Sequence, residues 1–161
     1  MVPLIQSGSP LAQAETPVAY PRSPVAELFH AQVQAVVGDR TVLQAGRGVR
    51  ILQQGLLPLY FLPASSLQLR HVRASDTLRI DDLGLAVHLH LFSGGHVARD
   101  AAWYYPGPDP DMAIIAGMIC LNPARLDALF LDGQRVSAGE QPGSWITANL
   151  RGYVLHRHGA A

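Results

Sequence analysis

The chain of 161 residues contains one cysteine, Cys120, and few charged residues. A lone cysteine cannot form an internal disulfide, so a disulfide scaffold is excluded and a reducing, cytoplasmic location is expected. Charged residues make up 15% of the chain, and the 12 Lys and Arg balance the 12 Asp and Glu. Because a chain of zero formal charge has no basic field to hold a phosphate backbone, we expect no nucleic-acid partner.

Long apolar runs are also missing. No run approaches the ~18 residues that a membrane span requires, and the first residues lack the charged start and apolar core of a secretory signal. We therefore expect no membrane partner. Apolar residues are nevertheless plentiful, at 48% of the chain, which is enough to build a core. Low charge also leaves little repulsion between copies, which is compatible with a homo-oligomer.

Proline content divides the chain into three parts. Residues 1–27 have prolines at positions 3, 10, 17, 21 and 24, and are predicted to form an extended or disordered arm. Residues 28–136 are predicted to form a single β domain. Residues 137–161 are predicted to be a C-terminal extension, in which a strand over residues 145–150 is the only expected element.

Short β-rich runs alternate with turn residues through the central part. Residues 25–37 have a composition that also suits a helix, but β-rich runs on both sides of Gly38-Asp39 predict a hairpin. Further strands are predicted over residues 48–52, 59–62, 67–70, 85–92 with a return at 96–99, 118–121, 126–131 and 134–136. Residues 74–76 are predicted to be a break. The pattern predicts a mainly β fold: a compact antiparallel β-sandwich or barrel-like domain of short strands with one short helix.

The most individual stretch is residues 100–117, DAAWYYPGPDPDMAIIAG. The alternation of a strand predicts that Trp103 and Tyr105 are buried on one face and that Tyr104 lies on the other. Asp111 is predicted to cap a short helix over residues 112–116, which Gly117 would end.

The order of these signals resembles the domain of unknown function family 427 (DUF427), also labelled a nucleotidyltransferase-like domain. The resemblance covers about residues 31–136, and Ala102-Trp103-Tyr104-Tyr105-Pro106 followed by a short helix is its most specific piece. The other matching pieces are residues 33–39, 49–52, 59–63 with 67, 84–86, 115–117 and 132–133. The resemblance implies a compact, mainly β domain with one short helix and no defined activity.

The chain also departs from the family pattern. Members commonly carry an acidic residue where this chain has Gln53, and a Thr-x-Cys-Pro-x-Lys-Gly run where this chain has residues 76–84, DTLRIDDLG. His88 takes the position of a family tyrosine. If a thiol, a lysine and a carboxylate carry a reaction in the family, this divergent member lacks it, which lowers the expectation of an enzyme.

His88 and His90 are the first candidates for a metal site, since the strand period puts both imidazoles on one face about 6.5–7 Å apart. In a tight hairpin at residues 93–95, His90 would lie opposite Arg99 and His88 opposite Ala101, and neither partner adds a ligand. A third ligand, His71 or Asp81, would have to come from another strand. We therefore favour a pocket wall or a solvated face, with no metal and no cofactor.

Two other groups have a chemical and a structural interpretation. Asp81 and Asp82 are an acidic pair that could hold Mg²⁺, but phosphoryl transfer also needs a phosphate cradle, so a structural turn is favoured. Cys120 lies in an apolar run and is expected to be a buried small hydrophobe rather than a nucleophile.

The favoured hypothesis is a non-catalytic β domain that binds a small-molecule ligand or a protein partner. The predicted ligand-binding residues are Tyr104, His88, His90 and Arg99. One alternative is a nucleotide-handling or metal-assisted enzyme. The other is a degenerate structural or assembly module whose N-terminal arm packs on a partner.

Overall fold

A computed structural model describes residues 1–152. Among these residues no helix is long and apolar enough to cross a membrane. The strands are β1 Leu4–Gln6, β2 Val25–Val37, β3 Arg40–Leu52, β4 Leu59–Pro63, β5 Val72–Asp81, β6 Gly84–Ser93, β7 His96–Tyr104, β8 Met118–Leu121, β9 Ala128–Leu131, β10 Gln134–Arg135, β11 Ser137–Ala138 and β12 Trp145–Ile146. Short 3₁₀ helices are η1 Pro17–Ala19, η2 Ala64–Ser66, η3 Leu69–His71, η4 Pro110–Ile115 and η5 Pro123–Arg125.

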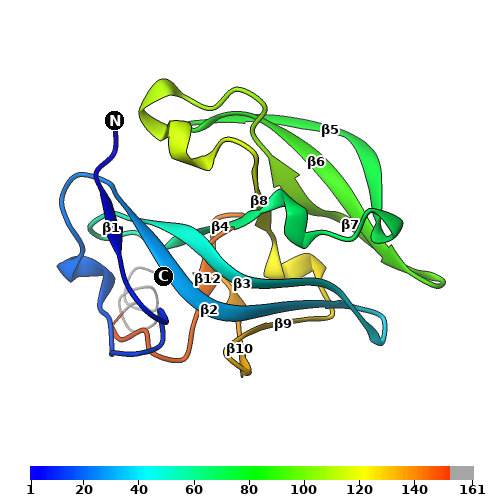
Figure 1. Ribbon diagram of the computed structural model, residues 1–161, viewed down its shortest axis with the longest axis horizontal. Helices are drawn as coiled ribbons and strands as arrows, with labels where there is room; N and C mark the ends of the chain where they lie inside the picture. The colour runs from blue at the N-terminus through cyan, green and yellow to red at the C-terminus, as the bar shows by residue number, and fades with distance from the viewer. Residues whose placement is uncertain (153–161) are drawn as a thin grey trace.

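The strands form one large, bent sheet in the order β10-β9-β2-β3-β4-β8-β7-β6-β5, with β1 added in parallel to β2. Every other pairing in this sheet is antiparallel. Figure 1 shows β2, β3 and β9 in the lower half of the view and β5 to β7 in the upper half, joined through β4 and β8. The predicted mainly β, antiparallel fold is therefore confirmed, as an open sheet compatible with a sandwich.

Two apolar clusters fill the two sides of this bend. The larger cluster includes Phe29, Leu43 and Leu91, which are fully buried, and Trp145. The smaller cluster contains Phe61, Trp103, Tyr105 and Cys120 among others. Tyr104 packs against the larger cluster, so the prediction that Trp103 and Tyr105 share a face opposite Tyr104 is confirmed.

The β2–β3 hairpin confirms the choice of hairpin over helix for residues 25–37. It is longer than predicted, because β3 continues from Arg40 to Leu52 through two glycines that break the apolar pattern. Gly48 is needed where β3 passes Phe29: a Cβ built there would lie 2.6 Å from the Phe29 ring and from the carbonyl oxygen of Phe61. The β9–β10 hairpin is also confirmed, with Asp132 and Gly133 both at the positive φ of a primed turn.

Other local predictions are wrong. Residues 67–70 are not a strand: residues 67–68 connect η2 to η3, and residues 69–70 belong to η3. The short-range alternation of apolar and polar residues did not reveal this. The predicted break at residues 74–76 is an irregular pairing inside the continuous strand β5. Of residues 145–150, only Trp145–Ile146 form a strand, and residues 153–161 of the predicted extension lie outside the described residues.

The short helix begins earlier than predicted and is a 3₁₀ helix. Its N-cap is Asp109, whose carboxylate accepts a hydrogen bond of 2.9 Å from the Asp111 N–H, so Asp111 is not the cap. Pro110 explains the shift, because its fixed φ suits the first helical position. Gly117, at φ +73°, follows the helix as expected.

The register of the β6–β7 hairpin also differs from the prediction. His88 lies opposite Trp103 rather than Ala101, and the pair of His90 and Arg99 is not formed. The pairing shifts between Leu89 and Leu91 where β7 bulges, with Asp100 at a positive φ of 52°. A bulge of this kind re-aims side chains and cannot be predicted from turn length alone.

Residues 1–27 lie against the sheet. β1 pairs with β2, and Glu15 bonds to the buried Arg50 through Nη2–Oε2 (2.5 Å), while Glu27 bonds to the same guanidinium through Nε–Oε1 (2.7 Å). The Asn149 amide donates hydrogen bonds to the carbonyls of Pro10 (2.7 Å) and Gln13 (2.8 Å). These hydrogen bonds from Asn149 to Pro10 and Gln13 join the two ends of the described chain and are called the clasp below.

Candidate functional site

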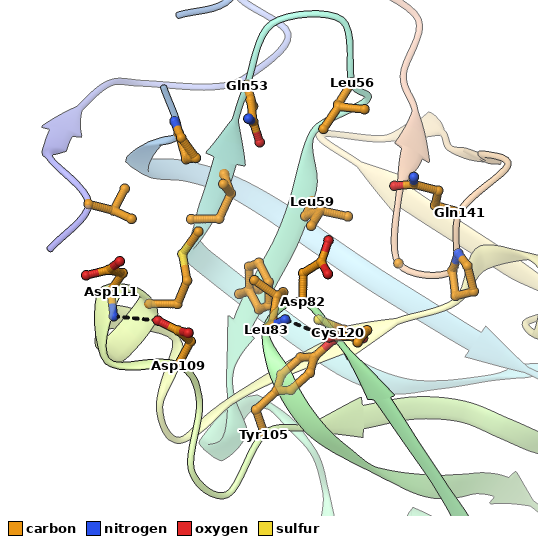
Figure 2. Close-up of a pocket in the computed structure, with 18 of the residues that line it drawn as sticks. Gln53, Leu56, Leu59, Asp82, Leu83, Tyr105, Asp109, Asp111, Cys120 and Gln141 are labelled. Carbon is orange, nitrogen blue, oxygen red and sulfur yellow. Dashed lines mark hydrogen bonds between the residues drawn. The ribbon is translucent and has the colours of Figure 1, made fainter. Parts of the chain in front are cut away.

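A pocket of about 770 Å³ lies where the first residues, the β3–β4 connection, the β5–β6 turn and η4 approach one another. Figure 2 shows Gln53 and Leu56 at one end, Tyr105 at the other, Asp109 and Asp111 on one side and Gln141 opposite them. Its apolar lining is Val2, Pro3, Pro24, Ile51, Leu56, Leu59, Phe61, Leu83, Trp103, Met112 and Pro142. Its acidic and basic lining groups are Asp81, Asp82, Asp109, Asp111, Arg79 and the α-ammonium of Met1.

Three neighbouring strands build the buried wall of this pocket. Trp103 on β7 lies directly opposite Cys120 on β8, and Phe61 comes from β4. All three side chains are at most 3% exposed. The indole N–H of Trp103 is buried and forms no hydrogen bond of good geometry among the described residues, although its interaction with the Tyr105 hydroxyl opposes the rise in the pKa of that tyrosine. A buried N–H without a well-placed acceptor is uncommon and calls for an explanation.

The guanidinium of Arg79 lies over the Trp103 ring of this wall. Its guanidinium carbon is 4.7 Å from the centre of the Trp103 ring, Nη1 lies 3.1 Å from His88 Nε2, and Nη2 bonds to Asp81 Oδ2 at 3.2 Å. Strand alternation explains the arrangement: Arg79 and Asp81 are two positions apart on β5 and share a face. Three partners therefore hold the guanidinium in one place.

Asp81 is fully engaged by its surroundings. Oδ2 also accepts a 2.8 Å hydrogen bond from the Tyr105 hydroxyl, and Oδ1 accepts a 2.9 Å bond from the Leu83 N–H, which shapes the β5–β6 turn. Burial, the neighbouring Cys120 and the hydrogen bond to Asp81 raise the pKa of Tyr105 above its ordinary range. Tyr105 thus stays a neutral donor at physiological pH, and Asp81 has the structural turn role that the sequence favoured.

Asp82 differs from its neighbour. It is exposed, lines the same pocket, and has no ion-pair or hydrogen-bond partner among the described residues. Figure 2 shows its carboxylate in the middle of the pocket, between Leu59 and Leu83. The turn thereby brings both members of the acidic pair to one pocket while leaving only Asp82 free.

Cys120 is buried, as expected for a small hydrophobe. Burial raises the pKa of its thiol well above the ordinary value, and the nearby Asp81 adds to the effect, while Arg79 opposes it. A thiol that stays protonated is a poor nucleophile, so the geometry does not activate it.

The four predicted ligand-binding residues do not line this pocket. His88 is buried behind Arg79, and burial together with that guanidinium lowers its pKa. Tyr104 lies on the opposite face of the sheet, and Arg99 is exposed beyond the bulge. His90 accepts a 2.9 Å hydrogen bond at Nδ1 from the Asp100 N–H. Only His88 contacts the pocket wall, through Arg79 and through the Trp103 ring, whose centre lies 5.4 Å away.

The bulge holds a second polar cluster. The Asp100 carboxylate accepts hydrogen bonds from the hydroxyls of Ser75 (2.5 Å) and Thr77 (2.9 Å), and lies 3.7 Å from His90 Nδ1. Partial burial opposes the charge of Asp100, but the two hydroxyls outweigh it and lower the pKa of the carboxyl. These bonds satisfy Asp100 locally and fix the irregular part of β5 to β7.

Metal-ligating residues do not gather in the described part of the chain. Nowhere in residues 1–152 do three His, Cys, Asp or Glu side chains lie close enough together to hold a metal ion. His71, the suggested third ligand, lies with Nδ1 3.0 Å from the carbonyl oxygen of Phe92.

Arg79 is the pocket residue that the sequence interpretation missed. A signal existed in the run Leu78-Arg79-Ile80-Asp81, whose period of two places the basic and acidic side chains on one face and the apolar pair on the other. The break predicted at residues 74–76 separates this alternation from the predicted strands.

Two comparisons bear on the identity of the chain. A family model described as a domain of unknown function (DUF427) matches residues 26–132. A search of curated proteins finds no match.

Proposed function

We propose that this chain, which belongs to the DUF427 family, is a non-catalytic domain that binds a small, largely apolar ligand in the pocket beside Trp103. The pocket itself carries the proposal. Its volume of about 770 Å³ falls within the range of small-molecule sites, and such sites combine apolar walls with a few fixed polar groups.

Preorganised side chains support ligand binding. Arg79, Asp81 and Tyr105 are tied to one another, so their side chains lose little freedom when a ligand arrives. The indole N–H of Trp103, which lacks a hydrogen bond of good geometry among the described residues, is a donor that an acceptor or an aromatic face of the ligand would satisfy.

The same contacts favour binding over catalysis. Arg79 and Asp81 are occupied by each other, and the Cys120 thiol is held protonated by burial. A nucleotide-handling enzyme would need a phosphate cradle, whereas among residues 1–152 Arg79 is the one basic side chain in a lining with four carboxylates. The lone, buried Cys120 also supports a reducing, cytoplasmic location.

The two tryptophans give a direct test by ¹⁵N-labelled NMR of the indole N–H signals. Trp103 lines the pocket, whereas the Trp145 indole donates to the carbonyl of Leu121 in the other cluster, at 3.3 Å. In a screen of small aromatic and aliphatic compounds, hits should move the Trp103 signal and leave the Trp145 signal unchanged. A screen without any Trp103 shift would contradict the proposal.

A blocking variant sharpens this test. Leu59→Trp places a large side chain inside the pocket at the start of β4, where an aromatic residue suits a strand. This variant should fold, but its Trp103 indole signal should no longer shift when a ligand is added. Leu69→Trp, at a side chain 87% exposed and outside the pocket, should keep the shift.

The predicted residues Tyr104, His88, His90 and Arg99 remain a separate hypothesis about the site. The double change Tyr104→Ala and His88→Ala distinguishes the two. If the double variant still binds the ligand, the site is not formed by these residues. The pocket proposal predicts only a modest loss of affinity, because His88 contacts and supports Arg79.

Association with another copy of the chain is a second candidate function, related to the assembly-module alternative. Leu78, Ile80 and Leu85 are exposed on one face of the β5–β6 hairpin, with Ile80 at 84%. Exposed apolar patches commonly mark interaction surfaces, and zero net charge adds no repulsion. In sedimentation velocity the wild type should dimerise and Ile80→Glu should not; a monomeric wild type would remove this candidate.

A further inference from the structure

We infer that the ligand of the pocket is an amphiphilic cation: an aromatic or aliphatic body that carries an amine. The inference rests on the proposed function and adds the chemical class of the ligand. It follows from the charges around the pocket, taken together with its apolar walls.

Negative charge is concentrated at this pocket and not over the molecule. The whole chain has zero formal charge, yet the described residues that line the pocket carry four carboxylates against one guanidinium and the α-ammonium of Met1. A cleft with low-dielectric walls focuses the field of such an excess and raises the local concentration of counter-ions. Cations are therefore the charged ligands that the pocket favours.

The carboxylates are not equally available. Asp81 is neutralised by Arg79 and also accepts the Tyr105 hydroxyl and the Leu83 N–H. Asp82 has none of these partners and points into the pocket (Figure 2). Asp82 is therefore the carboxylate that we assign to the amine.

Asp109 and Asp111 extend the negative charge along one side. Asp109 accepts the Asp111 N–H, and Asp111 lies 3.5 Å from the α-ammonium of Met1. Both groups of that ion pair are more than three-quarters exposed, so the contact is weak and exchangeable. An incoming amine meets little competition there.

An anionic ligand fits the pocket poorly. The guanidinium of Arg79, the one that the described residues contribute to the lining, is enclosed by Trp103, His88 and Asp81. An anion would have to break the bond between Arg79 and Asp81 and would then be repelled by the carboxylates of Asp82, Asp109 and Asp111. A neutral ligand would gain binding free energy only from apolar contacts with the pocket walls.

Three probes that share a phenylbutyl skeleton distinguish a cationic, a neutral and an anionic ligand. They are 4-phenylbutylamine, 4-phenylbutan-1-ol and 4-phenylbutanoate. Each is titrated into the labelled full chain at low salt, with the Trp103 indole as reporter and the Trp145 indole as internal control. The amine should bind about three- to tenfold more tightly than the alcohol, as expected for one or two partly exposed ion pairs. The probe 4-phenylbutanoate should bind most weakly, and added salt should reduce the differences in affinity among the three probes.

Variants test the assignment of the charges. Asp82→Asn with Asp111→Asn should remove the preference for the amine and leave the affinity for the alcohol unchanged. Asp39→Asn, an exposed change in the β2–β3 turn outside the pocket, should keep the preference.

The outcomes are distinct. If the alcohol or the carboxylate moves Trp103 at concentrations equal to or below those of the amine, the ligand class is wrong and the binding function stands. If the preference survives in the double variant, the assignment to Asp82 and Asp111 is overturned. If no probe moves Trp103 while the library screen does, an amphiphilic amine is excluded; if neither does, the proposed function fails as well.

Discussion

Replacing Arg50 should be the most damaging change to the fold outside the apolar core. The guanidinium is 2% exposed and bonds to Glu15 at 2.5 Å and to Glu27 at 2.7 Å, and Nη1 lies 3.4 Å from the Tyr60 hydroxyl. Desolvation opposes its charge, but these neighbours outweigh desolvation and raise its pKa. Arg50→Met preserves most of the volume and leaves two carboxylates without their cation.

The magnitude follows from the burial of those carboxylates. Breaking a buried ion pair from one side typically costs about 3–5 kcal/mol, because the remaining charge is uncompensated. At this chain length each 1 kcal/mol lowers Tm by about 2–4 °C, so Arg50→Met should lower Tm by about 6–20 °C. Adding Glu15→Gln and Glu27→Gln should recover more than half of the loss, since no charge is then left buried.

Urea unfolding followed by circular dichroism, with calorimetry for Tm, measures both effects. Arg47→Met is the matched control, because Arg47 is exposed on the same strand. It should change the free energy of unfolding by less than about 0.5 kcal/mol. The reasoning fails if Arg50→Met behaves like Arg47→Met, or if the triple variant is no more stable than the single one.

Three further perturbations test other parts of the structure. Burial raises the pKa of Tyr60 to about 12, so its contribution to stability is present below pH 10 and is lost as the pH rises through 12; the urea midpoint should fall over that window, and less so in Tyr60→Phe. Cys120→Ser should lower the free energy of unfolding by about 1–3 kcal/mol, because it buries a hydroxyl without a partner; in the wild type a thiol reagent should label Cys120 only after unfolding. Gly48→Ala should cost about 1–3 kcal/mol by urea titration, because its Cβ would lie 2.6 Å from a backbone oxygen.

Local chemistry explains the predictions that succeeded. Gly38-Asp39 and Asp132-Gly133 determine hairpins through their own backbone preferences, and both hairpins are present. The alternation that buries Trp103 and leaves Tyr104 on the other face also depends only on neighbouring residues. The DUF427 resemblance, confirmed over residues 26–132, rested on the order of such local signals.

The pocket forms between segments that are far apart in the sequence, so patterns among neighbouring residues could not predict it. Its lining comes from stretches of the chain as far apart as residues 1–3 and 141–143, which meet because the sheet bends at β4 and β8. The bulge at Asp100 places Trp103 rather than Ala101 opposite His88 and prevents the expected pairing of His90 with Arg99, while ligand binding at His88, His90, Arg99 and Tyr104 stays a prediction. Periodicity identifies a face, but it does not identify what lies opposite.

The clasp between the two ends has a consequence for folding kinetics. Asn149 reaches Pro10 and Gln13 across sequence separations of 139 and 136 residues, so these bonds close the longest loops in the described chain. Loop-closure entropy grows slowly, costing about 2 kcal/mol more than for a loop one tenth as long. Contacts between residues so far apart in the sequence form after the local hairpins. The clasp should therefore be completed late in refolding and exchange its amide hydrogens early, while β2 and β3 remain protected.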